Sequence, residues 1–400
     1  MTSGGGQSRA ACLEPIDILV AASGDWHAHT PVNSQEIARR WVAYGRVDYL
    51  EPAPLRAPSW SDRGRVVGRI RRLLGRSVGD AEVARPAMGA GPTVHAPWYV
   101  PWHPTPLVLR ANASLARRRV GRTRQRDVLW VFTPALAGCV DAFPAKLVVY
   151  HAVDDYAANP GVRPILVRRA EDRIVARADV VFVSSRPLLE RLSTKHDDVH
   201  LFENATDTDL LRPLPIPSGS TRKAVYVGNV APHKVDFELL REVAQRSPEW
   251  EILIIGPVQA EDGVVSPLFR LPNVRHLGPA TRADFASLLA EADVALLPLP
   301  KNTLRESSFP MKVADYFALG LPVVGPITAG LTSVRNLISE AETAEEFVAA
   351  MEEGAGLRRD GRYVAAARRE AEARSWGRRM EDIRALLASR LGDRAATPSA

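Results

Sequence analysis

The sequence predicts an α/β protein made of two doubly wound domains, each built on a parallel sheet. Three observations support this prediction. Short apolar runs alternate with stretches of helical periodicity, which is typical of parallel sheets covered by helices. This alternation is interrupted by a Pro/Ser-rich segment and then begins again. The length of 400 residues also exceeds what one hydrophobic core usually covers.

Four apolar runs in the first half of the chain are expected to be strands buried on both faces. They span residues 16–23, 127–134, 146–153 and 179–185. Between them, residues 34–45 and 163–178 repeat apolar side chains at helical spacing, which predicts helices. The first half is therefore expected to form one sheet with helices packed on it.

The second half repeats this pattern after the segment LRPLPIPSGS, residues 211–220, which is too rich in Pro and Ser for a helix or a central strand. Expected strands are 223–230, 250–258, 273–279 and 293–300, and expected helices are 236–248 and 281–292. A last helix begins at Ser375. The predicted organisation is an N-terminal domain of residues 1–214 completed by helix 375–392, a C-terminal domain of residues 215–374, and a disordered tail of residues 393–400.

Composition restricts the class of protein and its compartment. No apolar run is long enough to cross a membrane, and the N-terminal residues lack the pattern of a signal peptide. Cys12 and Cys139 lie far apart without metal-ligand spacing, which indicates a reducing compartment, no disulfide and no zinc site. Motifs of nucleic-acid binding are absent. We therefore expect a cytoplasmic protein with no nucleic-acid partner.

Two arginine-rich stretches carry much of the positive charge behind the formal net charge of +6. Seven arginines lie between Arg56 and Arg76 against the single acid Asp62, and seven more lie between Arg110 and Arg126 with no acid. In the first stretch, apolar residues at helical spacing leave one apolar and one basic face. Arg63–Arg76 is therefore able to lie on an anionic membrane surface. The alternative is a solvated helix in an arginine-rich protein.

The stretch SSFPMKVADYFALGLPVV, residues 307–324, is the most informative part of the chain. Ser307 and Ser308 are suited to cap the start of a helix, and Pro310 fits its first turn, where a missing N–H costs nothing. Gly320 provides a C-terminal stop before a buried strand. We expect a short helix between a polar corner and a strand.

Lys312 and Asp315 lie three residues apart on one face of this predicted helix, near the positive end of its dipole. Free N–H groups, a lysine and a carboxylate at one helix start are suited to a nucleotide diphosphate and its ribose. The alternative is an ordinary amphipathic helix with a surface lysine.

Polar residues also follow the predicted strands, at the edges where open α/β sheets bind ligands. Asp154 and Asp155 come directly after the strand 146–153. A partly desolvated carboxylate beside a second one has a raised pKa and is suited to act as a general base. The alternative is that one aspartate caps a helix start and the other binds a backbone turn.

Three histidines near these strand ends have two interpretations each. His27 and His29 lie on the loop after the first strand, where they are able to contact phosphate or acceptor or to have an ordinary loop role. His151 lies within the strand before Asp154 and is either a buried structural histidine or a catalytic one.

In combination, these segments resemble the nucleotide-sugar glycosyltransferases of the GT-B fold, near family 4. The resemblance is to the bacterial group that includes the teichuronic-acid-type enzymes and the xanthan glucuronosyltransferase. The segments that carry it are DW followed by SQEIARRWVAYGRVDYLEP, YHAVDDYAANPGVR with RRAEDRIVARADVVFVSSRPLLERL, FENATDTD, YVGNVAPHKVDFELL with NVRHLG, FPMKVADYFALGLPVV, and SWGRRMEDI. They cover most of the chain, least clearly between Pro52 and Arg126.

The resemblance implies that the second domain binds the donor. Lys312 looks like the family lysine that contacts the donor phosphates, and Asp315 stands where many relatives have Glu or Gln facing the ribose. Further donor residues implied by the same motifs are Gly228, His233, Lys234, Gly256, Pro257, Ser307, Ser308 and Met311. Retaining relatives carry Glu eight residues before the position of Asp315; here that position is Ser307, with Glu306 one residue out of register.

The function implied by the resemblance is metal-independent transfer of a sugar from a nucleotide-diphosphate donor to an acceptor hydroxyl or amine. GT-B enzymes stabilise the leaving diphosphate with a helix dipole and cations, so no metal or further cofactor is expected. The catalytic candidates are Asp154, Asp155 and His27. A polysaccharide, a lipid-linked intermediate and a small metabolite all stay open as acceptors. The alternatives are a nucleotide-sugar 2-epimerase on the same fold and a non-catalytic GT-B protein that binds a glycan or a partner glycosyltransferase.

Overall fold

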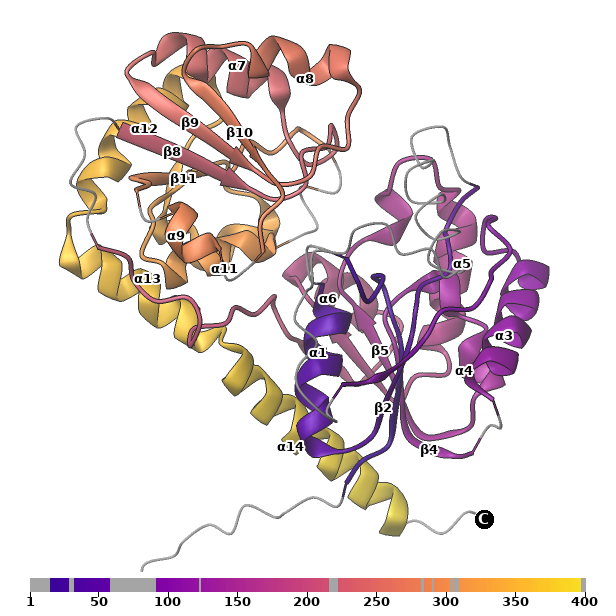
Figure 1. The fold of residues 1–400 in the computed structure, drawn as a ribbon. Coiled ribbons are helices and arrows are strands. Elements are labelled where there is room, and N and C mark those ends of the chain that lie inside the picture. Colours follow the sequence, from indigo (N-terminus) through magenta and orange to yellow (C-terminus); the bar gives the residue numbers. More distant parts are fainter. Residues whose placement is uncertain are drawn as a thin grey trace, which may run out of the picture.

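The computed structural model describes residues 15–28, 32–57, 91–121, 124–215, 222–281, 284–289, 291–302, 305 and 309–396. Within these residues the chain forms two parallel sheets, each covered by helices on both faces (Figure 1). The fold class predicted from the sequence is confirmed.

The first sheet has seven parallel strands, and most residues of its central strands are buried. In spatial order they are β3 (Thr93–His95), β2 (Val47–Leu50), β1 (Ile18–Ala21), β4 (Arg126–Val131), β5 (Ala145–Ala152), β6 (Val180–Val183) and β7 (Val199–Leu201). The polar side chains that follow β1 and β5 emerge at one edge, because parallel strands end on the same side of a sheet.

Alternate residues along these strands pack on opposite helical layers, as the two-residue period of a strand requires. One face packs against α3 (Pro106–Val120), α4 (Cys139–Ala142), α5 (Pro164–Val175) and α6 (Arg186–Ser193). The other face packs against α1 (Asn33–Trp41) and the C-terminal helix α14 (Trp376–Ala396). Cys139 is buried in the first of these layers.

The second sheet has six parallel strands in the order β10 (Val274–Gly278), β9 (Trp250–Ile255), β8 (Arg222–Val227), β11 (Val294–Leu296), β12 (Val323–Gly325) and β13 (Ile338–Glu340). Helices α7 (Phe237–Arg246), α8 (Asp262–Phe269) and α12 (Ala344–Leu357) cover one face. Helices α9 (Phe285–Leu289), α11 (Met311–Ala318) and α13 (Gly361–Ala373) cover the other.

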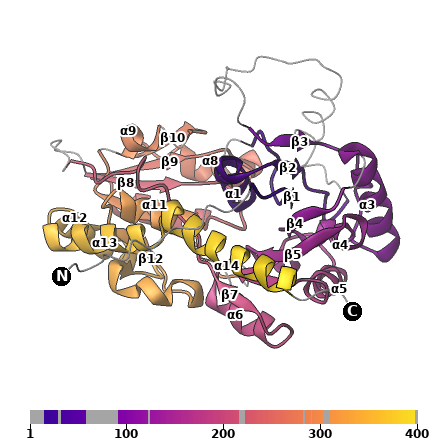
Figure 2. The ribbon, with the colours of Figure 1, turned by 90° about the horizontal axis from the view of Figure 1, so that it is seen from below.

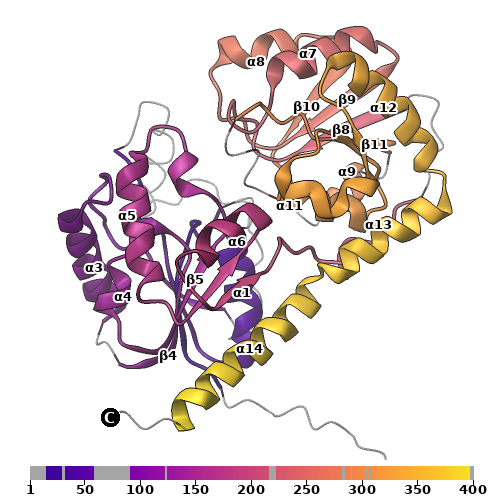
Figure 3. The ribbon, with the colours of Figure 1, turned by 180° about the vertical axis from the view of Figure 1, so that it is seen from behind.

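Helix α14 runs from the second domain back along the first, a course visible from below and from behind (Figures 2 and 3). Its buried side chains recur every three or four residues and join the core beneath the first sheet: Trp376, Met380, Ile383 and Leu387. The chain crosses between the domains twice, and the two crossings pair at Thr206 and Ser375.

The structure corrects two boundaries. Helix α14 continues to Ala396, so residues 393–396 are helical where a disordered tail was expected; residues 397–400 lie outside the described part. Pro310 is the residue before helix α11, not a member of its first turn. Gly320 follows the end of that helix at a φ of 71°, a left-handed conformation that suits glycine and ends the helix as predicted.

Candidate active site

Asp154 and Asp155 follow β5 after one intervening residue, at the carboxyl edge of the first sheet, and their contacts differ. Asp155 caps a short helical turn, because its Oδ1 accepts a hydrogen bond from the Ala157 N–H at 3.2 Å. Its Oδ2 accepts a hydrogen bond from Arg168 at 2.6 Å. Both carboxylate oxygens are thus engaged, which favours the capping alternative for Asp155, and its catalytic role stays a prediction.

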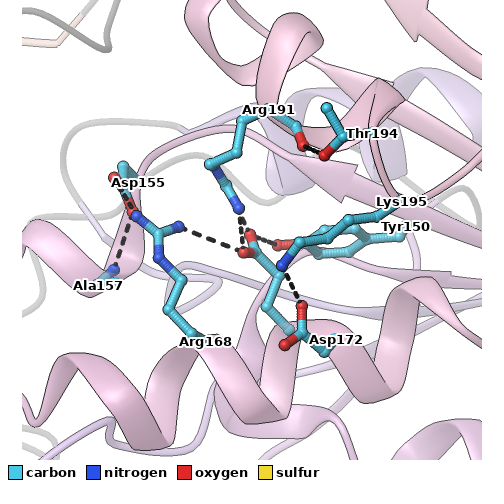
Figure 4. A network of polar contacts seen from close by, with 9 residues as sticks. Tyr150, Asp155, Ala157, Arg168, Asp172, Arg191, Thr194 and Lys195 are labelled. Atoms are coloured by element: carbon cyan, nitrogen blue, oxygen red, sulfur yellow. Dashed lines mark hydrogen bonds and ion pairs between the residues drawn. The ribbon is translucent and has the colours of Figure 1, made fainter.

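A network of arginines and carboxylates holds this edge in place (Figure 4). Its centre is Glu171, a buried residue of α5. Glu171 accepts hydrogen bonds from the Tyr150 hydroxyl at 2.9 Å, from Arg191 at 2.5 and 3.0 Å, and from Arg168 at 3.3 Å. Arg168 bridges this buried carboxylate to Asp155. The loop that carries the aspartates is therefore tied to two helices and a strand.

Asp154 is the aspartate left available for chemistry. Its Oδ1 is buried and has no hydrogen-bond partner. Burial raises the pKa of Asp154; the charge of Lys234 opposes this shift, and the charge of Asp155 adds to it. A carboxylate with a raised pKa and a free oxygen atom has the properties of a general base.

The loop after β1 carries His27, the third predicted catalytic residue. The side chain of His27 is exposed, and within the described residues no contact joins it to Asp154. The loop backbone is held by Gln35 of α1, whose amide donates to the carbonyls of Asp25 at 2.9 Å and Trp26 at 3.0 Å. His27 remains a prediction, and His29 lies outside the described residues.

His151 is buried on the side of the sheet that faces α14. Its ring lies 5.0 Å from that of Phe132 and 6.2 Å from that of Trp130, and neither ring nitrogen has a hydrogen-bond partner. Burial lowers the pKa of His151 to about 3, with a smaller contribution from Arg379. The side chain is therefore neutral at physiological pH and points into the core, which favours the structural interpretation.

In the second domain, two glycine turns let the loops after β8 and β9 approach closely. Gly228 has a φ of 141° and Gly256 a φ of 145°, both rarely adopted by other residues. A Cβ on Gly256 would lie 1.9 Å from the carbonyl oxygen of Gly228. Pro257 accepts a hydrogen bond from the Val230 N–H at 3.0 Å, which joins the loops after β8 and β9. Gly228, Gly256 and Pro257 therefore form one corner.

Lys312, in the first turn of α11, reaches into this corner. Its Nζ lies 3.8 Å from the ring centroid of Tyr226, and a Cβ on Gly228 would lie 2.8 Å from it. Burial lowers the pKa of Lys312 to about 7, and the charge of Lys234 acts in the same direction. A cation held this way gains stability from a nearby anion, because an opposite charge favours the protonated form.

Lys234 connects the two halves of the site electrostatically. Its charge acts on Asp154 of the first domain and on Lys312 of the second. The preceding residue, His233, accepts a hydrogen bond from the Asn302 side chain through its backbone carbonyl at 3.3 Å. The loop GNVAPHK thus brings a second cation near both Lys312 of helix α11 and Asp154.

The segment FENATD, residues 202–207, crosses between the domains and binds helix α11 and the residue before its start region through Asn204 and Thr206. We call these two residues the crossover clamp. The Asn204 amide nitrogen donates to the carbonyl of Phe309 at 2.5 Å, just before the helix. The Thr206 hydroxyl donates to Oδ1 of Asp315 at 2.6 Å, on the helix itself. Asn204 also accepts a hydrogen bond from Asn33 of the first domain at 2.6 Å. The predicted ribose residue Asp315 therefore bonds to the crossing between the domains.

Sequence reasoning missed several residues that shape this site. Tyr226 stands in a predicted strand and is not among the predicted site residues; the available signal is a polar-tipped ring two residues before a glycine turn. Thr206 and Asn204 were noted for resemblance alone, since their contacts lie more than 100 residues away in the sequence. Met311 begins α11 beside Lys312, whereas Ser307 and Ser308 lie outside the described residues.

The described residues contain neither a cluster suited to a metal ion nor a membrane-spanning helix. No group of three or more His, Cys, Asp or Glu side chains there is placed to hold a metal ion. No helix in that part of the chain is both long enough and apolar enough to span a bilayer. The stretch Arg63–Arg76, predicted to contact a membrane, lies outside the described residues.

Comparison with known proteins agrees with this architecture. The family model described as Glycosyl transferases group 1 matches residues 221–355, the core of the second domain. TuaH of Bacillus subtilis (strain 168), whose name assigns it as a glycosyltransferase of teichuronic acid biosynthesis, is 28% identical over 278 residues, which are 63% of this chain and 69% of TuaH.

Two solved structures share the fold. Sucrose-phosphate synthase from Thermosynechococcus elongatus superposes with a TM-score of 0.70 and 15% identity over 94% of this chain and 99% of that one. Anabaena HepE, in complex with UDP and glucose, gives a TM-score of 0.62 and 15% identity over 94% of this chain and 100% of its own. The solved structures confirm the GT-B fold, and the family model and TuaH confirm the resemblance to glycosyltransferases and the expectation of an enzyme of sugar transfer.

Proposed function

We propose that this GT-B glycosyltransferase moves a sugar from a nucleoside diphosphate donor to an acceptor hydroxyl, with Asp154 as the base and no metal ion. One observation carries the proposal. Lys234 of the second domain acts on the pKa of both Lys312 and Asp154, and Asp154 of the first domain has a carboxylate oxygen without a hydrogen-bond partner. Cations for a leaving diphosphate and a base for an acceptor are what this transfer needs.

In the proposed step, Asp154 takes the proton of the acceptor hydroxyl. At the same time, the oxygen of that hydroxyl forms a bond to the anomeric carbon of the sugar. The bond from that carbon to the diphosphate oxygen breaks on the opposite face, so the configuration is inverted. The negative charge that develops on the diphosphate is stabilised by Lys312 and Lys234. The proton bound to Asp154 is released to water after the product leaves.

The donor class is supported by the geometry around α11. The helix begins beside two glycine turns, so backbone N–H groups, the helix dipole and a buried lysine occupy one corner. HepE, which has the same fold, was solved with UDP and glucose. We therefore propose a nucleoside diphosphate sugar as donor and a glycan, lipid-linked or small-molecule hydroxyl as acceptor.

Ligand screening followed by turnover tests the proposal. A thermal-shift screen of UDP, GDP, TDP and their sugars should identify one nucleotide that raises the melting temperature, because a ligand bound to the folded state stabilises it. Release of that nucleotide from its sugar should then continue in EDTA. Loss of turnover in EDTA with recovery on Mg²⁺ or Mn²⁺ would overturn metal independence, and an NMR product with retained configuration would overturn the base assignment.

A further inference from the structure

The start of helix α1 carries a buried polar group that has no role in the proposed sugar transfer. Asn33 is the first residue of this helix and is 5% exposed. Its Oδ1 is buried and has no hydrogen-bond partner. The helix follows the first strand of the sheet and lies on the side of the first domain that faces the second (Figures 1 and 2). A buried acceptor without a partner costs free energy, and such groups are rare in native proteins.

A chain of hydrogen bonds determines which atom of Asn33 is unpaired. The Phe309 carbonyl is only an acceptor, so the Asn204 amide must direct its Nδ2 to it, in a contact of 2.5 Å. Oδ1 of Asn204 then needs a donor, which is Nδ2 of Asn33 at 2.6 Å. The remaining atom of the Asn33 amide is therefore the carbonyl oxygen. A carbonyl oxygen accepts hydrogen bonds, so its missing partner is an O–H or N–H group and not a phosphate.

The polar side chains that follow Asn33 on the helix have their partners within the protein. The Ser34 hydroxyl lies 3.2 Å from the hydroxyl of Ser23 and 3.2 Å from that of Tyr49. The amide nitrogen of Gln35 donates to two backbone carbonyls of the loop after β1, at 2.9 and 3.0 Å. The unpaired oxygen of Asn33 is therefore an exception within an otherwise hydrogen-bonded helix start.

Asn33 is connected to the donor helix of the second domain. Its partner Asn204 belongs to the crossing segment and binds the Phe309 carbonyl. Phe309 stands two residues before Met311, where α11 begins, and Lys312 is the next residue of that helix. The Asn33 amide therefore belongs to the junction at which the first domain meets the start of α11.

The start of α1 is also connected to the loop of the candidate base. Ser34 bonds to Ser23, and the Ser23 side chain hydrogen-bonds to Tyr156. Burial raises the pKa of Tyr156, and the charge of Asp154 adds to this shift. The residue next to Asn33 thus belongs to the same polar edge of the first domain as Asp154.

We propose that Asn33 is a specificity-determining residue whose Oδ1 accepts a hydrogen bond from a hydroxyl of the transferred sugar. This rests on the proposed function, in which the sugar is attached to a diphosphate at α11 and is attacked by an acceptor activated by Asp154. The sugar carries hydroxyl donors, whereas an ionised diphosphate offers acceptors alone. A site built to bind a hydroxyl rejects the analogue that lacks it, because the buried group then stays unpaired. Since Oδ1 is buried in the structure, the proposal requires the two domains to separate while the sugar enters.

Turnover of deoxy donors by the full chain tests the proposal. The probes are UDP-glucose, or the nucleotide sugar that the thermal-shift screen selects, and its monodeoxy analogues. The wild type should prefer the intact donor to one of these analogues about 10- to 100-fold in kcat/KM. Asn33→Ala should bring that ratio close to one and leave the ratios for the other analogues unchanged. Asn33→Ser repeats the test with a small polar side chain, so the result does not depend on the stability of Asn33→Ala.

Two controls separate sugar recognition from a structural role. Ser34→Ala removes a hydroxyl that is bonded within the protein and should keep the wild-type ratios. The affinity of Asn33→Ala for the nucleoside diphosphate alone should equal that of the wild type, because this ligand lacks the sugar. Unchanged ratios in Asn33→Ala, or a loss of diphosphate affinity as large as the loss with the sugar, would overturn the role of Asn33 alone. A wild type that turns over no nucleotide sugar would overturn the proposed function and this inference with it.

Discussion

The two sheet edges that meet at the candidate site differ in how their charges are compensated. On the first-domain edge, Asp155 and Glu171 are surrounded by the donors of Arg168 and Arg191. On the second-domain edge, Lys312 is buried against an aromatic ring, and no carboxylate among the described residues pairs with it. These two carboxylates of the first edge are paired with cations, whereas Lys312 of the second edge has no anionic partner among the described residues.

Asp154 is the exception on the first edge, because its Oδ1 has no partner. Leaving a buried carboxylate oxygen unsatisfied costs free energy, and Asp154 combines this cost with a raised pKa at a sheet edge where ligands bind in open α/β folds. We infer from the comparison that the uncompensated groups are those that the substrates complete. A diphosphate would complete Lys312, and an acceptor hydroxyl would complete Asp154.

The strongest test of this contrast is Asp154→Asn. The amide keeps the shape of the side chain but cannot accept the acceptor proton, so turnover should fall about 10²–10⁴-fold with donor affinity unchanged. Asp172→Asn, on the exposed side of α5, is the matched control and should keep normal turnover. Near-normal turnover in Asp154→Asn would place the base elsewhere, with His27 the next candidate.

The next largest effect is expected from Lys312→Ala. Losing a charge-assisted contact to the diphosphate should weaken nucleotide binding by roughly 1.5–3 kcal/mol, about 10- to 100-fold. Calorimetry of the nucleotide identified by the thermal-shift screen gives the measurement. Lys301→Ala removes the same charge from an exposed position of the same domain and serves as control. Equal affinities in wild type and Lys312→Ala would remove Lys312 from the donor site.

Removing one contact of the crossover clamp should change how helix α11 is positioned. Thr206→Val removes the hydroxyl that donates to Asp315 and leaves the shape of the side chain. The free energy of unfolding should fall by about 1.5–3 kcal/mol, and Asp315 should lose a contact that orients it. Turnover should fall more than donor affinity, and Thr206→Ser should restore both. Thr208→Val, two residues further along the same segment, is the control. Unchanged turnover in Thr206→Val would show that the clamp does not position the donor helix.

Asp155→Asn should affect stability in place of chemistry. The variant keeps the cap, because Asn caps about as well as Asp, but it loses the partly exposed ion pair with Arg168, so the free energy of unfolding should fall by up to about 1 kcal/mol. Turnover per folded molecule should stay near wild type at a temperature well below the melting transition. A large loss of turnover without loss of stability would assign a catalytic role to Asp155 after all.

The smallest expected effect is the uptake of a proton by Lys312 when a diphosphate binds. The pKa of Lys312 is lowered to about 7, so a sizeable share of free protein lacks this proton near pH 8. A bound diphosphate favours the charged form and should raise this pKa, so binding should take up a fraction of a proton at pH 8 and none near pH 5. Calorimetry in buffers of different ionisation enthalpy measures the uptake, which should vanish in Lys312→Ala.

The lowered pKa of Lys312 also makes the free energy of unfolding depend on pH. An unfolded chain holds the Lys312 proton up to its ordinary pKa, above that of the folded chain, so the unfolded state binds more protons between about pH 7 and that value. The destabilising contribution of this lysine is therefore full below pH 7 and is relieved as the pH rises through that window.

Sequence patterns predicted the central strands because these are buried on both faces and appear as continuous apolar runs, as in β5 and β9. They did not predict β3 or β7, which are three residues long and lie at the edges of the first sheet. An edge strand is half exposed and leaves no apolar run, so its sequence resembles a loop. Helix α3 was missed for a related reason, because its arginines mask a weak apolar stripe.

The chain alone determined the two-domain architecture and the residue types at the strand ends, because strand and helix periodicities are local properties of the sequence. Tertiary packing decided which of these residues is available. Asp154 and Asp155 are adjacent and chemically alike, yet only Asp155 meets Arg168 from the next helix. Lys312 owes its lowered pKa to burial beside Tyr226 and Lys234, which lie far away in the sequence. Desolvation and charge coupling depend on distances in space, and these exist only once the two domains are packed together.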